Sequence, residues 1–160
     1  MDRAATFHAP LESPIGRLWV TVSPRGLVSV TRGEDPDLHV GSRGLDPEAA
    51  APVLGELEAY FAGDLRTFTV ALDLAGAAAF DAAAWAAARQ VPYGETVSYG
   101  ELAAMAGHPG AARVAGNAMA RCPFSPVVPC HRVIHADGSI GGWGADTWIK
   151  RWLLDHEQGR

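Results

Sequence analysis

The chain has 160 residues, of which 48% are hydrophobic, and its formal net charge is −5 at pH 7. This size and composition suit one or two small globular units, and no apolar run approaches the roughly 20 residues that a membrane-spanning helix needs. Residues 1–88 carry 6 basic and 12 acidic side chains, whereas residues 89–160 carry 7 and 6, so the second part of the chain is free to approach nucleic-acid phosphates.

The first part of the chain predicts strands and one helix. Alternating apolar residues, Gly and Pro turns, and helical spacing of apolar side chains mark these elements. In chain order they are strands over 16–22 and 26–31, a loop over about 33–47, a helix over 47–61 and a strand over 68–74. We interpret residues 1–76 as a small α/β domain with a short sheet and a scaffolding role.

The remainder, residues 77–160, is predicted to be mostly helical. An alanine-rich helix spans 79–90, a break follows at 92–96, and two short helices end near 106 and 120 with a Gly-Pro turn between them. Ser98 and Glu101 fit a capping box at the start of the first short helix. Such a pair matches a DNA-binding helix-turn-helix, although an ordinary helical hairpin has the same spacing. The fold class predicted for the whole chain is therefore α+β.

Few features point to a metal or a cofactor. The two cysteines, Cys122 and Cys130, are expected to be free thiols and are too few for a Cys-rich zinc site. The six histidines lack regular ligand spacing, and the sequence has no phosphate-binding Gly-rich loop or dinucleotide fingerprint. We expect neither metal nor cofactor. Because no secretory signal begins the chain, we expect a cytoplasmic protein.

The residues around Cys130 indicate nucleophilic chemistry. The thiol follows an apolar run, and Pro129 fixes the backbone before it, while His131 and Arg132 come directly after it. A thiolate is the reactive form, and a nearby imidazole or guanidinium lowers the pKa of a thiol. Cys130 is therefore a candidate nucleophile with His131 as its base. The alternative is a buried structural cysteine, because free cysteines are often buried.

The motif Pro-Cys-His-Arg-Val-Ile at 129–134 resembles the signature of the methylated-DNA–protein-cysteine methyltransferases, also called alkylguanine-DNA alkyltransferases. Four further segments resemble other motifs of that family. They are the opening strand motif at 13–16, the entry to the helix-turn-helix at 91–103, the recognition helix at 111–119 and the closing helix at 152–157. The resemblance therefore covers most of the chain.

The resemblance implies direct DNA repair by transfer of an alkyl group. The damaged nucleotide is flipped out of the duplex, because a stacked base hides the reacting carbon. Cys130 then takes the alkyl group from guanine O6, or less well from thymine O4. His131 removes the thiol proton through a bound water, Glu157 orients this histidine, and Tyr99 donates a hydrogen bond to guanine N3. The product is a thioether without a good leaving group, so each molecule reacts once.

The partner that the resemblance implies is duplex DNA containing alkylated guanine, bound by a monomer. Arg113 occupies the gap left by the flipped nucleotide. The helix that carries it consists mostly of small residues and enters the minor groove, where readout is degenerate. Close packing on a neighbouring helix is the alternative explanation for those small residues. The full set of predicted DNA-contacting residues is Ser98, Tyr99, Ala112, Arg113 and Arg132.

The predicted substrate pocket is where this chain departs from the family pattern. Cys122 stands where the family usually has asparagine, and a thiol cannot replace the paired hydrogen bonds of an amide. Trp143 enlarges an aromatic wall, Gly144 lacks a hydroxyl, and Asp146 adds an acid. The predicted pocket residues are Met119, Cys122, Val128, Pro129, Trp143 and Gly144.

Two alternatives stand beside DNA repair. The first, which these departures support, is an alkyltransferase-like enzyme that acts on a small metabolite rather than on DNA. The second is a protein that senses alkylated DNA without repairing it, but relatives of that sort lack the cysteine that this chain retains.

Overall fold

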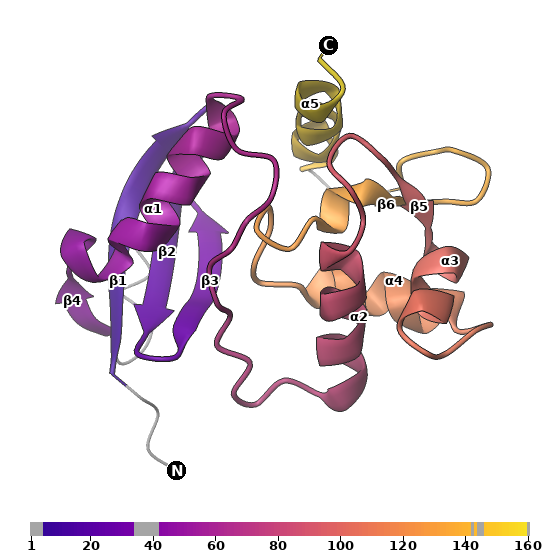
Figure 1. Ribbon diagram of the computed structural model, residues 1–160, viewed down its shortest axis with the longest axis horizontal. Helices are drawn as coiled ribbons and strands as arrows, with labels where there is room; N and C mark the ends of the chain where they lie inside the picture. The colour runs from indigo at the N-terminus through magenta and orange to yellow at the C-terminus, as the bar shows by residue number, and fades with distance from the viewer. Residues whose placement is uncertain (1–4, 34–41, 142, 144–145, 160) are drawn as a thin grey trace. The chain divides into compact units, whose positions relative to one another are not determined.

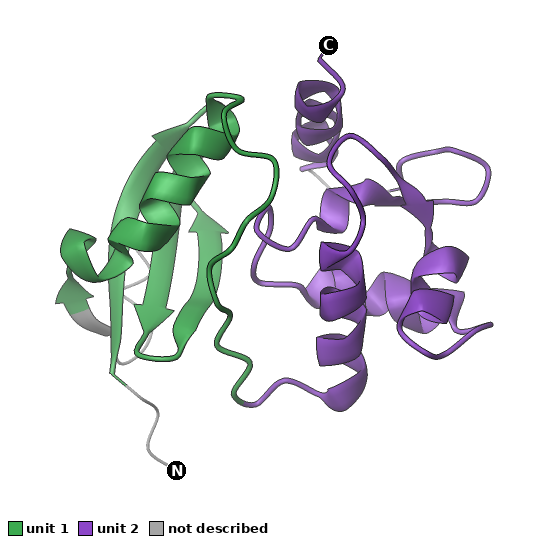
Figure 2. Ribbon diagram, viewed as in Figure 1, with its two compact units in different colours: residues 1–75 green, residues 76–160 purple. Residues whose placement is uncertain are grey.

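The computed structural model describes residues 5–33, 42–141, 143 and 146–159 of the chain. It divides into two compact units, residues 1–75 and 76–160, which are coloured separately in Figure 2. The elements confirm the α+β class predicted from the sequence. None of the helices within the described ranges combines the length and the apolarity that crossing a bilayer requires.

Unit 1 is a four-stranded sheet with one helix, α1, packed on it (Figure 1). Its elements are β1 (Thr6–Ser13), β2 (Gly16–Ser23), β3 (Gly26–Arg32), β4 (Ser42–Leu45) and α1 (Pro47–Phe61). The strand order is β3-β2-β1-β4, antiparallel except for the parallel pair β1–β4. Pro47 opens α1, and the Asp46 side chain accepts a hydrogen bond from the Ala49 N–H at 3.0 Å.

The core of unit 1 lies between α1 and the sheet face that alternate strand residues supply. Ala9 pairs with Val20 and Leu11 with Leu18, so their side chains share one face. Those four residues are buried, as are Ala50, Val53, Leu57 and Tyr60 of α1. The alternation predicted for the strand at 16–22 and the helical spacing predicted for 47–61 therefore both place apolar side chains in the same core.

Residues 68–74 do not form the predicted strand. Leu72 makes only an isolated bridge to Leu27. The N–H groups of Thr69 and Val70 instead donate to the Glu56 carboxylate of α1, at 2.8 and 3.1 Å, which removes them from any strand ladder. Two strands were not predicted: β1, whose alternation Pro10 interrupts, and β4, which lies in the predicted loop, of which residues 34–41 fall outside the described ranges.

Unit 2 carries the remaining helices and a two-stranded parallel sheet. Its elements are α2 (Ala79–Arg89), β5 (Val97–Ser98), α3 (Tyr99–Met105), α4 (Ala112–Arg121), the 3-10 helix η2 (Cys130–Arg132), β6 (Val133–Ile134) and α5 (Thr147–Glu157). The predicted capping box is confirmed: Ser98 Oγ accepts from the Glu101 N–H, and Glu101 Oε1 accepts from the Ser98 N–H. Val97 pairs with Val133 and Ser98 with Ile134, which brings the start of α3 beside the segment that follows Cys130.

Small residues let α4 pack closely in unit 2. Ala115 and Ala118 are fully buried, whereas Ala112 is exposed. The indole N–H of Trp85 in α2 donates to the Ala118 carbonyl at 2.9 Å. The Trp85 ring packs edge-on against Phe124, with the ring centroids 5.5 Å apart. Packing therefore accounts for part of the small-residue pattern, and the exposed remainder of α4 is left for another role.

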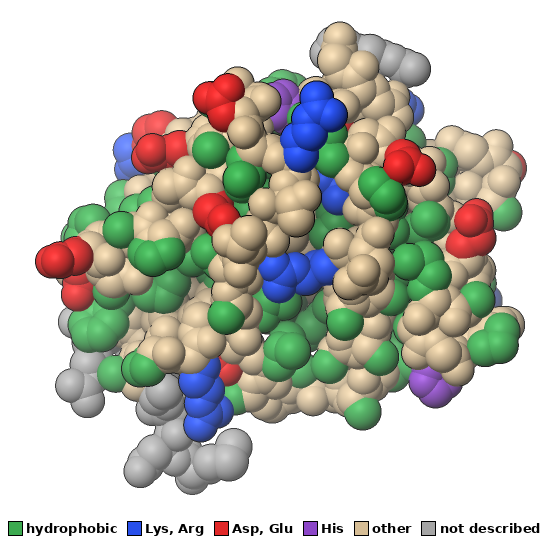
Figure 3. Space-filling view, viewed as in Figure 1, with side chains coloured by type: hydrophobic (Ala, Val, Ile, Leu, Met, Phe, Trp, Pro, Cys, Tyr) green, Lys and Arg blue, Asp and Glu red, His purple; other side chains and the backbone are tan. Residues whose placement is uncertain are grey.

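Charge is distributed unequally between the units. Figure 3 shows one face of the molecule, on which acidic side chains are more frequent over unit 1 than over unit 2. This matches the acidic excess of residues 1–88 in the sequence. On this face (Figure 3), unit 2 is the less acidic of the two units, which suits an approach to a polyanion.

Candidate active site

Cys130 begins η2 and lies at the edge of a cavity. Its N–H donates to the Val128 carbonyl at 2.8 Å, which turns the chain sharply after Pro129. The residue is only 2% exposed. It nevertheless lines a cavity of about 410 Å³, together with Met119, Ala120, Cys122, Ser125, Trp143 and Asp146. The thiol is therefore shielded from bulk water but faces a space that can hold a substrate group.

The electrostatics of Cys130 differ from the expectation. Burial raises the pKa of the thiol well above its usual value, and the neighbouring Cys122 thiol raises it further. The backbone N–H of Cys130 and the Lys150 ammonium lower it, but by less. The prediction that His131 or Arg132 lowers this pKa is wrong, because His131 is neutral and Arg132 is paired elsewhere.

His131 is fully buried, with one ring nitrogen bonded to Glu157. Its Nε2 lies 2.5 Å from Glu157 Oε2, and because a carboxylate only accepts, Nε2 carries the hydrogen. Burial lowers the pKa of His131 despite this carboxylate. Among the described residues, Nδ1 of the ring has no hydrogen-bond partner. The imidazole is therefore neutral and keeps one nitrogen able to accept a proton.

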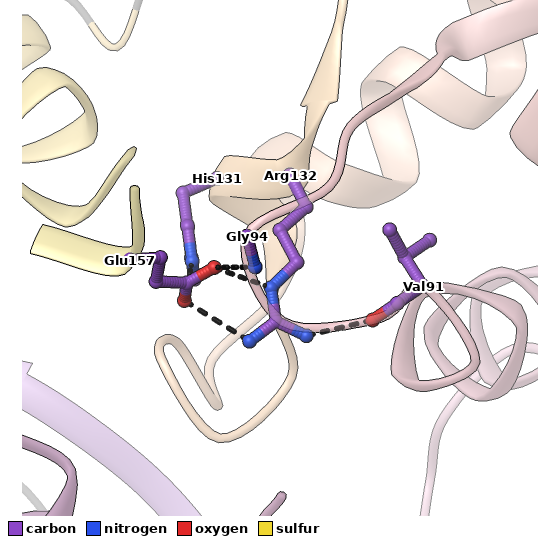
Figure 4. A network of polar contacts seen from close by, with 5 residues as sticks. All are labelled: Val91, Gly94, His131, Arg132 and Glu157. Atoms are coloured by element: carbon purple, nitrogen blue, oxygen red, sulfur yellow. Dashed lines mark hydrogen bonds and ion pairs between the residues drawn. The ribbon is translucent and has the colours of Figure 1, made fainter. Parts of the chain in front are cut away.

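Glu157, the last residue of α5, is the centre of the network in Figure 4. Arg132 donates to it twice, from Nε at 2.8 Å and from Nη2 at 3.0 Å, and the Gly94 N–H donates at 3.2 Å. Gly94 has a φ of +79°, which favours glycine, and a Cβ there would lie 3.3 Å from the Glu157 carbonyl oxygen. The carboxylate is therefore fixed in position against His131.

Arg132 does not fit the predicted DNA contact. It is 5% exposed, and its Nη1 donates to the Val91 carbonyl at 2.7 Å while its other nitrogens hold Glu157. A guanidinium in this position reaches a phosphate only by giving up its ion pair with a buried carboxylate. In the structure, Arg132 holds the Glu157 carboxylate in position.

Lys150 is a site residue that the sequence analysis missed. Its side chain is fully buried on α5, and its Nζ donates to the Val133 carbonyl at 2.8 Å and to the Tyr99 hydroxyl at 3.4 Å. Burial lowers the pKa of Lys150 to about 8. The available signal was its spacing: Lys150 lies three, four and seven positions before Leu153, Leu154 and Glu157, on the same buried helix face.

Tyr99 lies close to both Lys150 and Cys130. Burial raises the pKa of its hydroxyl, and negative charge on Cys130 raises it further, so the phenol keeps its proton and can donate it in a hydrogen bond. The Tyr99 ring packs edge-on against the His135 ring, with the ring centroids 5.2 Å apart. At Gly141, with φ +75°, a Cβ would lie 3.0 Å from His135 Nε2 and 3.3 Å from the Tyr99 hydroxyl oxygen. His135 is a second neighbour of the site for which the sequence carried no signal.

The other predicted residues fall into four groups. Ala112 and Arg113 are exposed in the first turn of α4, and Ser98 is partly exposed with its hydroxyl in the capping box. Met119, Cys122 and Trp143 line the cavity with Cys130. Val128 and Pro129 are buried beside Cys130 but do not line the cavity, and Gly144 lies outside the described residues. Within the described ranges, no three His, Cys, Asp or Glu side chains are arranged to hold a metal ion.

Both units match models of one protein family. Residues 7–74 match the model described as 6-O-methylguanine DNA methyltransferase, ribonuclease-like domain. Residues 79–159 match the model described as 6-O-methylguanine DNA methyltransferase, DNA binding domain.

Individual relatives agree with these models over nearly the whole chain. The methylated-DNA–protein-cysteine methyltransferase of Mycobacterium tuberculosis is 42% identical, over 96% of this chain and 93% of its own length. A DNA base-flipping protein of Thermus thermophilus is 39% identical, over 92% and 97%. The crystal structure of Mycobacterium tuberculosis OGT in complex with DNA superimposes with a TM-score of 0.84 at 40% identity, over 96% and 93%. These names all concern DNA, so they lend no support to the small-metabolite alternative.

Proposed function

The chain belongs to the 6-O-methylguanine DNA methyltransferase family, and on that premise we propose that it repairs DNA by moving an alkyl group onto its own Cys130. The alkyl group comes from guanine O6 or, less well, thymine O4, and each molecule reacts once. One observation carries the proposal. A cysteine that opens on a cavity is followed directly by a buried histidine, and that histidine is held by a carboxylate with its second nitrogen unpaired.

The proton leaves Cys130 by way of His131. The unpaired Nδ1 accepts it through one bridging water, and the imidazolium that forms is stabilised by the 2.5 Å contact with Glu157. Arg132 and the Gly94 N–H hold that carboxylate in place. Until this proton transfer takes place, burial keeps the sulfur in its neutral thiol form.

The thiolate then attacks the alkyl carbon of an extruded nucleotide. A sulfur–carbon bond forms, the carbon–O6 bond breaks, and its electron pair stays on guanine. Tyr99 stabilises the leaving base by donating a hydrogen bond, and Lys150, which donates to the Tyr99 hydroxyl, makes the phenol a stronger donor. The product is a thioether on Cys130 that water does not cleave.

Nucleotide extrusion depends on α4. Arg113 and Ala112 are exposed in its first turn, while its buried face is fixed against α2. An arginine at this place can fill the stack that the extruded base leaves, and the short alanine side chain permits close approach to a groove. We expect the protein to bind as a monomer and to work in the cytoplasm.

A mass measurement tests the proposal. The protein is incubated with a duplex containing O6-methylguanine, and its intact mass and fragment masses are recorded. We expect a gain of one methyl group, located on Cys130. Cys130→Ser should gain none while still binding the duplex. A methyl group on any other residue, or methyl transfer by Cys130→Ser, would refute the assignment.

A further inference from the structure

The two cysteines of this chain lie against one cavity. Cys122 closes the C-terminal end of α4, Cys130 opens η2, and both line the cavity of about 410 Å³. The Cys122 thiol is near enough to raise the pKa of the Cys130 thiol by direct interaction. Both are free cysteines. The second thiol is thus a feature of this chain that the transfer reaction does not use.

The segment between the two cysteines is fixed at both ends. The Cys122 N–H donates to the Met119 carbonyl at 3.2 Å, and the Val128 N–H donates to the Phe124 carbonyl at 3.1 Å. Phe124, Val127 and Val128 are at most 2% exposed. The thiols are therefore held near each other by the fold, which is the condition under which one thiol captures the other instead of an external partner.

Exposure assigns the two sulfurs different roles. Cys122 is partly exposed, whereas Cys130 is 2% exposed. A small disulfide in solution therefore meets Cys122 first. Because exchange proceeds through a mixed disulfide, the buried sulfur needs only to attack its neighbour.

We propose that Cys122 and Cys130 form a reversible disulfide by exchange with a low-molecular-weight disulfide such as oxidised glutathione, and that this bond switches off the acceptor. The Cys122 thiolate attacks one glutathione sulfur, and one glutathione thiol leaves. The Cys130 thiolate then attacks the Cys122 sulfur, and the second glutathione thiol leaves. Two protein thiols are oxidised and one glutathione disulfide is reduced to two thiols. The loss of repair rests on the proposed function, but the disulfide itself does not.

Counting thiols tests the proposal directly. The full-length reduced protein is incubated with oxidised glutathione, and acid stops the exchange and unfolds the chain. The unfolded protein is then labelled with excess iodoacetamide in denaturant at mildly alkaline pH, where free thiols react, and is weighed intact. Since the chain has two cysteines, an internal disulfide leaves no site for label and adds no glutathione. We expect this outcome, together with an about tenfold or greater loss of transfer from free O6-benzylguanine that dithiothreitol reverses.

Cys122→Ser and Cys122→Asn are the matched variants, each compared with its own reduced sample. Without the first sulfur, Cys130 should remain labelled and should keep most of that variant's transfer after the same treatment. The proposal is overturned if the wild-type protein takes two labels, ends as a mixed disulfide, or doubles in mass. It is also overturned if the variants lose transfer as the wild-type protein does. Absence of transfer in every reduced sample would instead refute the proposed function, while the thiol count would still decide the disulfide.

Discussion

At Cys130, burial favours the neutral thiol, whereas proton transfer to His131 would favour the thiolate. Burial raises the pKa of the thiol, so the resting side chain is neutral. In the proposed mechanism, the His131–Glu157 pair provides a route for the proton when an alkyl carbon enters the cavity. Such a sulfur is protected from chance electrophiles in water and becomes reactive inside the site.

Removing the base should slow transfer without removing the acceptor. Asparagine in place of His131 can still donate to Glu157 but cannot take up a proton. We expect His131→Asn to slow transfer from O6-benzylguanine by about 100-fold, the usual contribution of a general base. The measurement is the single-turnover rate, with thermal unfolding as a control for folding. An unchanged rate in a folded variant would remove His131 from the mechanism.

The raised pKa of Cys130 predicts the pH dependence of its reactivity. Below the pKa the thiolate fraction rises about tenfold for each pH unit. Labelling of Cys130 by iodoacetamide, located by fragment masses, should therefore keep accelerating from pH 7 past pH 9, the usual value for a thiol. A rate that levels off below pH 8 would mean that the site lowers the pKa and would contradict the burial argument.

At the residue scale, sequence reasoning named candidate reacting groups that lie close together in the structure, but it did not predict their electrostatics. Cys130, His131 and Glu157 were named from the motif and the resemblance. The pKa direction was wrong, because adjacency in sequence places His131 and Arg132 near Cys130 without showing that both turn toward Glu157. Lys150 was missed, since a single lysine on an amphipathic helix usually reaches solvent.

At the scale of elements, three segments bring the site together. The β5–β6 pair holds the start of α3 beside η2. The end of α5 brings Glu157 within hydrogen-bonding distance of His131. The starts of α1 and α3 were predictable because Pro47 and the Ser98–Glu101 capping box mark them locally, whereas α5 begins at Thr147, well before the closing segment 152–157 named from the sequence. The absent strand at 68–74 was not predictable, because a side chain from a distant helix, Glu56, takes its backbone donors.

The role of α4 predicts a substrate-dependent defect. Arg113→Ala removes the side chain that fills the stack, so transfer from a methylated duplex should slow by about 10-fold or more. Transfer from free O6-benzylguanine needs no extrusion and should change little. Arg151→Ala, which removes one exposed charge from α5, is the matched control for general electrostatic attraction. Equal losses on both substrates in Arg113→Ala would refute the extrusion role.

At the scale of the whole molecule, the sequence indicated an acidic first part and a second part suited to DNA. The α+β class was predicted because strand alternation and helical spacing occur in separate stretches of the chain. Strand order and the β1–β4 pairing were not, since nothing local specifies which strands become neighbours. The proposed chemistry lies in unit 2, and the scaffolding role of unit 1 stays a prediction.

The burial of Lys150 should make the free energy of unfolding of the protein depend on pH. Its pKa is about 8 in the folded protein and 10.5 as the ordinary value. Between these pH values the unfolded chain holds a proton that the folded protein has released, so this group's contribution to the free energy of unfolding rises with pH. The wild-type value minus that of Lys150→Met should increase by on the order of 2 kcal/mol across this window. Denaturant unfolding at several pH values measures it, and a flat or falling difference would contradict the buried ammonium.

The most direct test of the account is a titration with excess substrate. The protein is mixed with a tenfold excess of duplex containing O6-methylguanine, and repaired guanine is counted over time. Because the thioether on Cys130 is a dead end, we predict a plateau at one repaired guanine per protein molecule. Repair that continues past one equivalent, with Cys130 unmodified, would contradict it.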